Sequence, residues 1–298
     1  SAPRLPLSTT TNDTTPTITG SAEAGSTENL YNGTTLLGSA KTNENGVFSI
    51  TSSILSSGSY SLTAIAIDTA GNLSSASAPL AITIDTTAPA APLITTDIAL
   101  TKINTPTITG TTAPGTTVTL LDGDNALGTV IADNDGSFSI TSSVLVDADY
   151  TLTVTATDEA GNTSVPSTGL PITIDTTAPA APVITTSGSI SSKTPAISGT
   201  AEAGSTVSLF IDGADTGVTV QADETGAYTV VPTSDLTEGI HTFTISTTDA
   251  AGNTSSNSVD IDVDTVIELP VITTSGSISS KTPAINGTAE AGSTVSLF

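Results

Sequence analysis

The chain is built from a sequence repeat of about 90 residues, and this repeat constrains the fold more than any other feature. The segment PTITG at 16–20 returns at 106–110, and PAISG at 195–199 and PAING at 283–287 follow at similar intervals. A turn motif, D-x-A-G-N, occupies 68–72, 158–162 and 249–253. A unit of this length is too long for one solenoid turn and long enough for a small domain with its own core.

We therefore predict separate domains joined in series. Their boundaries are placed at 1–87 (repeat 1), 88–177 (repeat 2) and 178–266 (repeat 3), followed by 267–298, the truncated N-terminal third of a fourth repeat (the fragment). Residues 183–210 and 271–298 differ only at Ser198 and Asn286. The fragment cannot close a core alone, so Val295, Leu297 and Phe298 are expected to form an unprotected edge.

Short runs of alternating apolar and polar residues predict the secondary structure. In repeat 2 the expected strands are 92–95, 106–111, 116–121, 126–132, 137–141, 150–157 and 171–174. Thr, Val and Ile dominate these runs, and a branched Cβ suits a pleated sheet. About seven antiparallel strands per unit predict an all-β fold of tandem immunoglobulin-like β-sandwich domains in an elongated array.

A tyrosine near the start of the sixth strand supports this fold. Tyr60 and Tyr150 lie eight residues before the turn Asp, the place of the tyrosine corner in immunoglobulin-like domains. His241 takes this place in repeat 3. We therefore interpret the only histidine of the chain as a structural substitute rather than a catalytic base.

Composition excludes several function classes. The chain has 29 acidic and 5 basic residues, and binding to nucleic acid or to an anionic membrane needs the Lys and Arg clusters that it lacks. It has no Cys, so disulfides, zinc–thiolate sites and thiol nucleophiles are excluded. No run approaches the roughly 18 apolar residues of a transmembrane helix. The chain begins with Ser and without a signal peptide, so we interpret it as a segment of a larger protein. Separately, we expect no membrane insertion and a monomeric state.

Acidic residues recur at positions that the topology brings to one pole of each sandwich. Three loops of each repeat are expected at the N-terminal pole: the loop between the second and third strands (B–C loop, AEAGS at 22–26 in repeat 1), the next polar turn (NENG at 43–46) and the turn between the sixth and seventh strands (F–G turn, D-x-A-G-N). The last strand delivers an Asp (the exit Asp) to the following unit. Uncompensated carboxylates repel one another, and Ca²⁺ takes six to eight oxygen ligands in flexible geometry. We therefore predict structural Ca²⁺ at the junctions between repeats, with these metal-site residues: Glu23, Asp68, Asp85, Asp133, Asp158, Asp175, Glu202, Asp223, Asp249, Asp264 and Glu290.

The segments between repeats fit the same role. IDTTAPAAP occurs at 84–92 and again at 174–182, and its two Pro residues favour an extended path. The last such segment, VDTVIELP at 263–270, has one Pro and is expected to be looser.

We predict no enzyme activity. A Ser–His–Asp arrangement would depend on His241 alone, and paired carboxylates for glycoside hydrolysis need an aromatic-walled cleft. Aromatic residues make up 3% of the chain, and Phe48, Phe138 and Tyr228 follow a turn glycine, which marks them as core. Two function classes stay open: a structural extender, and repeats that themselves bind a host glycan or protein ligand.

The quoted motifs, with TPAISGTAEAGSTVSLFIDG, ADETGAYTV and TTDAAGNTS, resemble the bacterial immunoglobulin-like repeats of giant type I-secreted adhesins and biofilm-associated surface proteins. The resemblance covers essentially the whole chain. It implies an extracellular, cell-surface segment that projects a distal adhesive region, with other domains contacting a host or abiotic surface. It also implies interdomain Ca²⁺ on Asp85 with Asp158, on Asp175 with Glu202 and Asp249, and on Asp264 with Glu290. Repeat 2 departs from the pattern, since it has TAPGT at 112–116 where the others have AEAGS, and this loop therefore lacks the Glu.

Overall fold

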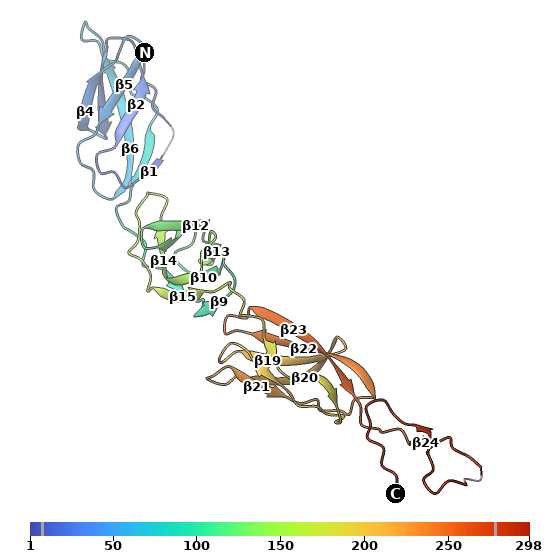
Figure 1. The fold of residues 1–298 in the computed structure, drawn as a ribbon. Coiled ribbons are helices and arrows are strands. Elements are labelled where there is room, and N and C mark those ends of the chain that lie inside the picture. Colours follow the sequence, from blue (N-terminus) through green and yellow to red (C-terminus); the bar gives the residue numbers. More distant parts are fainter. Residues whose placement is uncertain (7–8, 277–278) are drawn as a thin grey trace. The chain divides into compact units, whose positions relative to one another are not determined.

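The computed structural model describes residues 1–6, 9–276 and 279–298, and these are built from strands, turns and loops (Figure 1). By internal contacts the chain divides into two units, Ser1–Ile174 with repeats 1 and 2, and Asp175–Phe298 with repeat 3 and the fragment. No helix with the length and apolarity to span a bilayer occurs among the described residues.

Repeat 1 is a two-layer sandwich. One sheet has the order β1-β7-β6-β3-β4, and β2 with β5 forms the other. Its strands are β1 (Thr9–Thr11), β2 (Thr17–Ser21), β3 (Thr27–Asn32), β4 (Thr35–Lys41), β5 (Val47–Thr51), β6 (Gly58–Ile67) and β7 (Leu80–Ile84).

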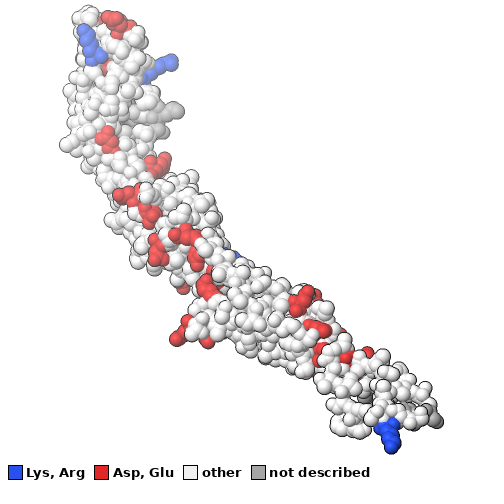
Figure 2. Space-filling model, in the orientation of Figure 1, with Lys and Arg blue, Asp and Glu red and all other residues white. Residues whose placement is uncertain are grey.

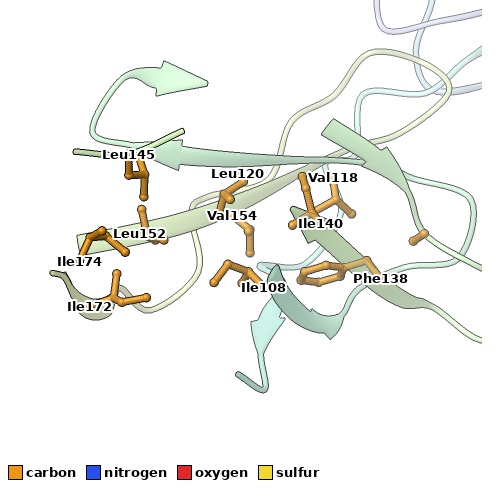
Figure 3. Packing of buried hydrophobic residues seen from close by; sticks show 11 residues of the cluster. Ile108, Val118, Leu120, Phe138, Ile140, Leu145, Leu152, Val154, Ile172 and Ile174 are labelled. Atoms are coloured by element: carbon orange, nitrogen blue, oxygen red, sulfur yellow. The ribbon is translucent and has the colours of Figure 1, made fainter. Parts of the chain in front are cut away.

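Repeat 2 has the same arrangement, with sheets β12-β11-β14-β15-β9 and β13-β10-β8. Between them lies a closed apolar core, in which the Phe138 ring packs beside Ile108 and Ile140 (Figure 3). Its strands are β8 (Leu93–Ile94), β9 (Leu100–Thr101), β10 (Thr107–Thr111), β11 (Thr117–Asp122), β12 (Asn125–Ile131), β13 (Ser137–Thr141), β14 (Ala148–Thr157) and β15 (Leu170–Ile174).

Repeat 3 forms sheets β17-β23-β22-β19-β20 and β16-β18-β21. Its last strand starts soon after the F–G turn and is twice as long as β7 or β15. The strands are β16 (Val183–Ile184), β17 (Gly188–Ile190), β18 (Ile197–Thr200), β19 (Thr206–Ile211), β20 (Ala214–Gln221), β21 (Ala227–Val230), β22 (Gly239–Thr248) and β23 (Thr254–Val263).

In the described part of the fragment, 267–276 and 279–298, the strands are the short pair β24 (Val271–Ile272) and β25 (Gly287–Thr288). Its Val295 and Leu297 are exposed, whereas the equivalent Val207 and Leu209 of repeat 3 are fully buried. The difference arises because the described residues of the fragment form a single two-stranded sheet, with no second sheet to cover these side chains. Phe298 is also exposed, so these three residues are solvent-accessible, as the sequence predicts.

One strand pairing in each repeat was not foreseen. The sequence predicts antiparallel strands only, yet β1 pairs parallel with β7, β9 with β15 and β17 with β23. The first strand of the repeat changes sheet and continues in its original direction. The seventh strand runs in that same direction, because six reversals separate the two, so their pairing is parallel.

Candidate functional site at the repeat junctions

The Asp of the D-x-A-G-N motif closes the F–G turn that it begins. Asp68 Oδ1 accepts hydrogen bonds from the backbone N–H groups of Ala70 and Asn72, and its Oδ2 accepts one from Asn72 Nδ2 at 2.8 Å. The Asn72 side-chain bond is the main cause of the lowered pKa of Asp68. Asp158 and Asp249 make the same paired contacts with Asn162 and Asn253.

Burial raises the pKa of Asp158 and of Asp249, but the hydrogen bonds from the turn outweigh it, so both pKa values are lowered. These carboxylates are therefore held in the charged form by their own turns. These carboxylates accept hydrogen bonds within their own turns and so stabilise them, as in Asx turns.

The Asn at the end of the motif connects the turn to the preceding linker. Asn162 Nδ2 donates to the main-chain oxygen of Asp85 at 2.8 Å, and Asn253 Nδ2 donates to that of Asp175 at 2.8 Å. A backbone bond from Asn12 N to Ala160 O, at 3.0 Å, adds a second link between repeats 1 and 2. The predicted convergence of exit Asp and F–G turn is thus present at these two junctions, but through an amide that the sequence analysis had not singled out.

The remaining predicted residues lie in turns at the same pole. Asp223 Oδ1 accepts from the backbone N–H groups of Thr225 and Ala227, and the Thr225 hydroxyl contact is the first cause of its lowered pKa. Asp133 accepts a long bond from Ser137 Oγ at 3.4 Å. Backbone bonds tie the B–C loop to this polar turn, for example from Ala22 N to Gly46 O at 3.0 Å.

Acidic residues of the B–C loops meet other predicted residues in two places. Glu23 and Asp68 line a hollow of about 120 Å³ at the pole of repeat 1. Asp264 and Glu290 line a hollow of about 410 Å³ at the junction of repeat 3 with the fragment, where Glu290 also accepts a bond from Glu268 N. For Glu202, the backbone oxygen accepts bonds from Ser205 within its own loop.

The oxygen atoms at the junctions are of the type that binds a hard cation, but the number of carboxylate side chains that gather there is small. Carboxylate and main-chain oxygens are the ligands that Ca²⁺ prefers. Within the described residues, however, no three His, Cys, Asp or Glu side chains form a group that could hold a metal ion. Figure 2 shows Asp and Glu spread over the visible surface of the three repeats. A junction ion would therefore have to take much of its coordination from backbone oxygens and water.

The structure places His241 at the corner that Tyr60 and Tyr150 occupy. Tyr60 Oη donates to Ser56 O and Tyr150 Oη to Val146 O, each four residues upstream, and His241 Nε2 lies 3.0 Å from Thr237 O. Its Nδ1 lies 2.7 Å from Asp212 Oδ2. Both ring nitrogens therefore face acceptors, which favours the doubly protonated ring. The contact with Asp212 is the main cause of the raised pKa of His241 and, reciprocally, of the lowered pKa of Asp212.

This pair predicts a pH dependence confined to repeat 3. The contribution of His241 to the free energy of unfolding is fully present below the ordinary histidine pKa of 6.5, and it is lost as pH rises through the raised pKa of His241. The contribution of Asp212 to the free energy of unfolding is present above the ordinary aspartate pKa of 3.8, and it is lost as pH falls through the lowered pKa of Asp212. Hydrogen exchange in β22 should therefore be slower, after correction for intrinsic rates, at about pH 5.5 than at about pH 8.5. His241→Tyr should remove the difference, and exchange in β14 of repeat 2 should not show it.

Glu28 is a buried carboxylate that sequence reasoning missed. It lies on β3, fully buried, where repeats 2 and 3 have Val118 and Val207. Its Oε1 accepts from Ser26 Oγ at 2.6 Å, while Oε2 is buried without a partner in the described part of the chain. Alignment of the three repeats could have revealed it, as a charged residue at a strand position where the other two repeats have Val.

Comparison with known proteins agrees with the fold. A family model described as a bacterial Ig-like domain matches residues 8–86, 95–176 and 184–265. Chitinase A1 of Niallia circulans is 36% identical over 151 residues, which are 48% of this chain and 21% of that protein, so the chain spans about a fifth of this curated relative.

Two solved structures illustrate the likeness. One is a calcium-stabilised adhesin that helps an Antarctic bacterium reach out and bind ice, at 22% identity over 91% of this chain and 76% of that chain, with a TM-score of 0.39. The other is a tetra-tandem repeat from the extending region of a large adhesion protein, at 25% identity over 91% and 77% of the two chains, with a TM-score of 0.29. The family model matches most of the sequence in three successive copies, and the chain therefore belongs to the bacterial Ig-like domain family.

Proposed function

We propose that this chain is a non-catalytic extender segment of a bacterial cell-surface adhesin, exported by type I secretion, that projects a distal region used in adhesion or biofilm formation. The observation that carries the proposal is the repeated joint. Asn162 and Asn253 each donate to the main-chain oxygen of the Asp at which the preceding linker begins. A spacer built from repeats needs the same contact wherever one repeat follows another, and these two bonds are equivalent. Three separate apolar cores are consistent with this role.

The proposal includes Ca²⁺ at the junctions. The carboxylates of Asp85 and Asp158 would contribute at the first, those of Asp175 and Asp249 at the second, and those of Asp264 and Glu290 at the third. Asn162 already brings Asp158 and the main chain of Asp85 to one side-chain amide, and Asp264 and Glu290 line one hollow. The ion would neutralise like charges and limit rotation about the linker. Glu23 with Asp68 supplies a similar pair at the pole of repeat 1.

Calcium is expected to raise the melting temperature of the whole chain. Extracellular calcium modules bind with dissociation constants of roughly 10⁻⁴–10⁻³ M. A calcium concentration about a hundred times the dissociation constant would then stabilise each occupied site by ~2.7 kcal/mol. Scanning calorimetry in EDTA and in excess Ca²⁺ measures the effect, with Mg²⁺ at the same ionic strength as the control.

Exit-Asp variants test which residues contribute. Asp85→Asn should reduce the calcium-dependent shift, because it removes one carboxylate without altering an F–G turn. Asp97→Asn, an exposed Asp outside the predicted set, should leave the shift unchanged. Equal melting temperatures in EDTA and Ca²⁺ would remove the metal from the proposal and leave the extender role. Reproducible hits on a glycan array would instead favour repeats that bind a ligand directly.

A further inference from the structure

The two linkers of this chain have the same sequence but different surroundings. Residues 85–92 (linker 1) and 175–182 (linker 2) both read DTTAPAAP. Each precedes a complete repeat, and each has its first main-chain oxygen bonded to the Asn of the following F–G turn. Any difference in their behaviour must therefore come from the repeats on either side rather than from the linker itself. On the preceding side, Ser57 of repeat 1 bonds the Thr86 hydroxyl of linker 1 at 2.7 Å.

Repeat 3 contacts its linker along most of its length. Besides the bond from Asn253 to Asp175 O, Ser255 Oγ donates to Ala180 O at 3.1 Å and Asn257 Nδ2 donates to Pro182 O at 3.0 Å. The three donors alternate along the chain at the start of β23, so they point to the same side of that strand. They bond the main-chain oxygens of the first, sixth and eighth residues of linker 2.

Repeat 2 has donors of this kind at only one of the equivalent positions. Asn162 corresponds to Asn253, but Ser164, the counterpart of Ser255, is buried and donates to Val165 O within its own loop. Pro166 stands in the place of Asn257 and has no side-chain donor. Among the described residues, linker 1 thus receives one side-chain bond from the repeat that follows it.

Burial and strand length agree with this difference. Pro179 of linker 2 is buried, whereas Pro89 at the same place in linker 1 is only half-buried. In repeat 3, β23 begins at Thr254, next to the F–G turn, and β17 pairs only with its last residues, from Ile261 to Val263. In repeat 2 the corresponding strand begins only at Leu170, and the chain between has no continuous strand.

We propose that repeat 3 captures the linker that enters it through Asn253, Ser255 and Asn257, so that linker 2 moves as a part of repeat 3 while linker 1 stays mobile. How firmly a linker is held is then encoded at the start of the last strand of the following repeat, not in the linker sequence. The partner of this binding surface is an extended, proline-containing segment presenting main-chain carbonyls. The hydrogen bonds to linker 2 do not depend on the proposed function. The idea that they serve a spacer rests on the proposed extender role.

Backbone ¹⁵N relaxation of the whole chain in EDTA tests this proposal. Ala180 and Ala181 should have order parameters near those of rigid backbone, about 0.85, while Ala90 and Ala91 should fall toward about 0.6 or below. The double variant Ser255→Ala/Asn257→Ala should lower the values of Ala180 and Ala181 to those of Ala90 and Ala91. Ser256→Ala, on the same strand with its side chain on the other side, is the matched control. Unchanged amide shifts of Ile245 and Ile261 would confirm that repeat 3 stays folded.

The outcomes separate this proposal from the calcium hypothesis. Equal order parameters for the two linkers in the unaltered chain would overturn it, as would a double variant whose linker 2 is as rigid as before. Repeating the measurement in Ca²⁺ tests the metal independently. A contrast present in EDTA and unaffected by Ca²⁺ would support capture while counting against the metal, whereas two mobile linkers that become rigid only in Ca²⁺ would do the reverse.

Discussion

Gly110→Ala is expected to destabilise repeat 2 by about 3 kcal/mol, at the upper end of the cost of overpacking a core. Gly110 lies on β10, opposite Phe138 of β13 and beside Ile94 of β8. A Cβ here would overlap the backbone oxygen of Leu93 and lie 2.8 Å from Phe138 Cε1. The oxygen belongs to a paired backbone and cannot move alone. The melting temperature of repeat 2 should fall by roughly 15 °C, given 4–8 °C per kcal/mol for domains of this size.

Native-state hydrogen exchange followed by mass spectrometry measures the loss for repeat 2 alone, through peptides of β11 and β14. Ser139→Ala, an exposed substitution on β13 next to Phe138, should change stability by less than about 0.5 kcal/mol. Peptides of repeats 1 and 3 should be unaffected by either variant. Exchange in β11 and β14 that is the same in Gly110→Ala as in the unaltered chain would show that the two sheets can separate enough to admit a methyl group.

The same contact shows how far the sequence predicts the fold. Alternation in PTITG places Ile108 inward, and the period of about 90 residues gives three cores. The reason for the glycine lies in an aromatic ring nearly thirty residues away, so only the tertiary structure provides it. The parallel pair of Leu100–Thr101 with β15 was likewise out of reach, because a two-residue strand carries no periodic signal.

The candidate site was predictable in position but not in chemistry. The repeated Asp and the exit Asp identified from sequence the two segments that meet at each of the first two junctions. The contact between them uses the amide of Asn162 or Asn253, and the turn carboxylates are used first by their own loops. Side-chain direction at a junction depends on the neighbouring repeat, which a single-repeat pattern does not contain. For the same reason, the identical linker sequences did not indicate that Ser255 and Asn257 bond to the main chain of linker 2.

Glu28→Val is expected to stabilise repeat 1 by about 1–3 kcal/mol, a gain comparable to the loss at Gly110 in size and opposite in sign. Glu28 is fully buried, and one of its carboxylate oxygens has no partner among the described residues. Burying such an oxygen costs free energy that two hydroxyl contacts, from Ser26 and Thr42, only partly offset. The melting temperature of repeat 1 should rise by roughly 4–8 °C per kcal/mol gained.

The other repeats supply the matched variants for this position. At the positions equivalent to Glu28 and Thr42, repeat 2 has Val118 and Ala132, and repeat 3 has Val207 and Ala222. Glu28→Val alone leaves the buried Thr42 hydroxyl without its carboxylate acceptor, so Glu28→Val/Thr42→Ala should be at least as stable as the single variant. The reverse change, Val118→Glu, should destabilise repeat 2 by more than about 3 kcal/mol, because Ala132 offers the carboxylate no donor. Exchange of β6 peptides measures the first two variants, and exchange of β14 peptides measures the third. If both Glu28 variants exchanged faster than the unaltered chain, the carboxylate would be a net stabilising group, and its burial would need a partner that Ser26 and Thr42 do not provide.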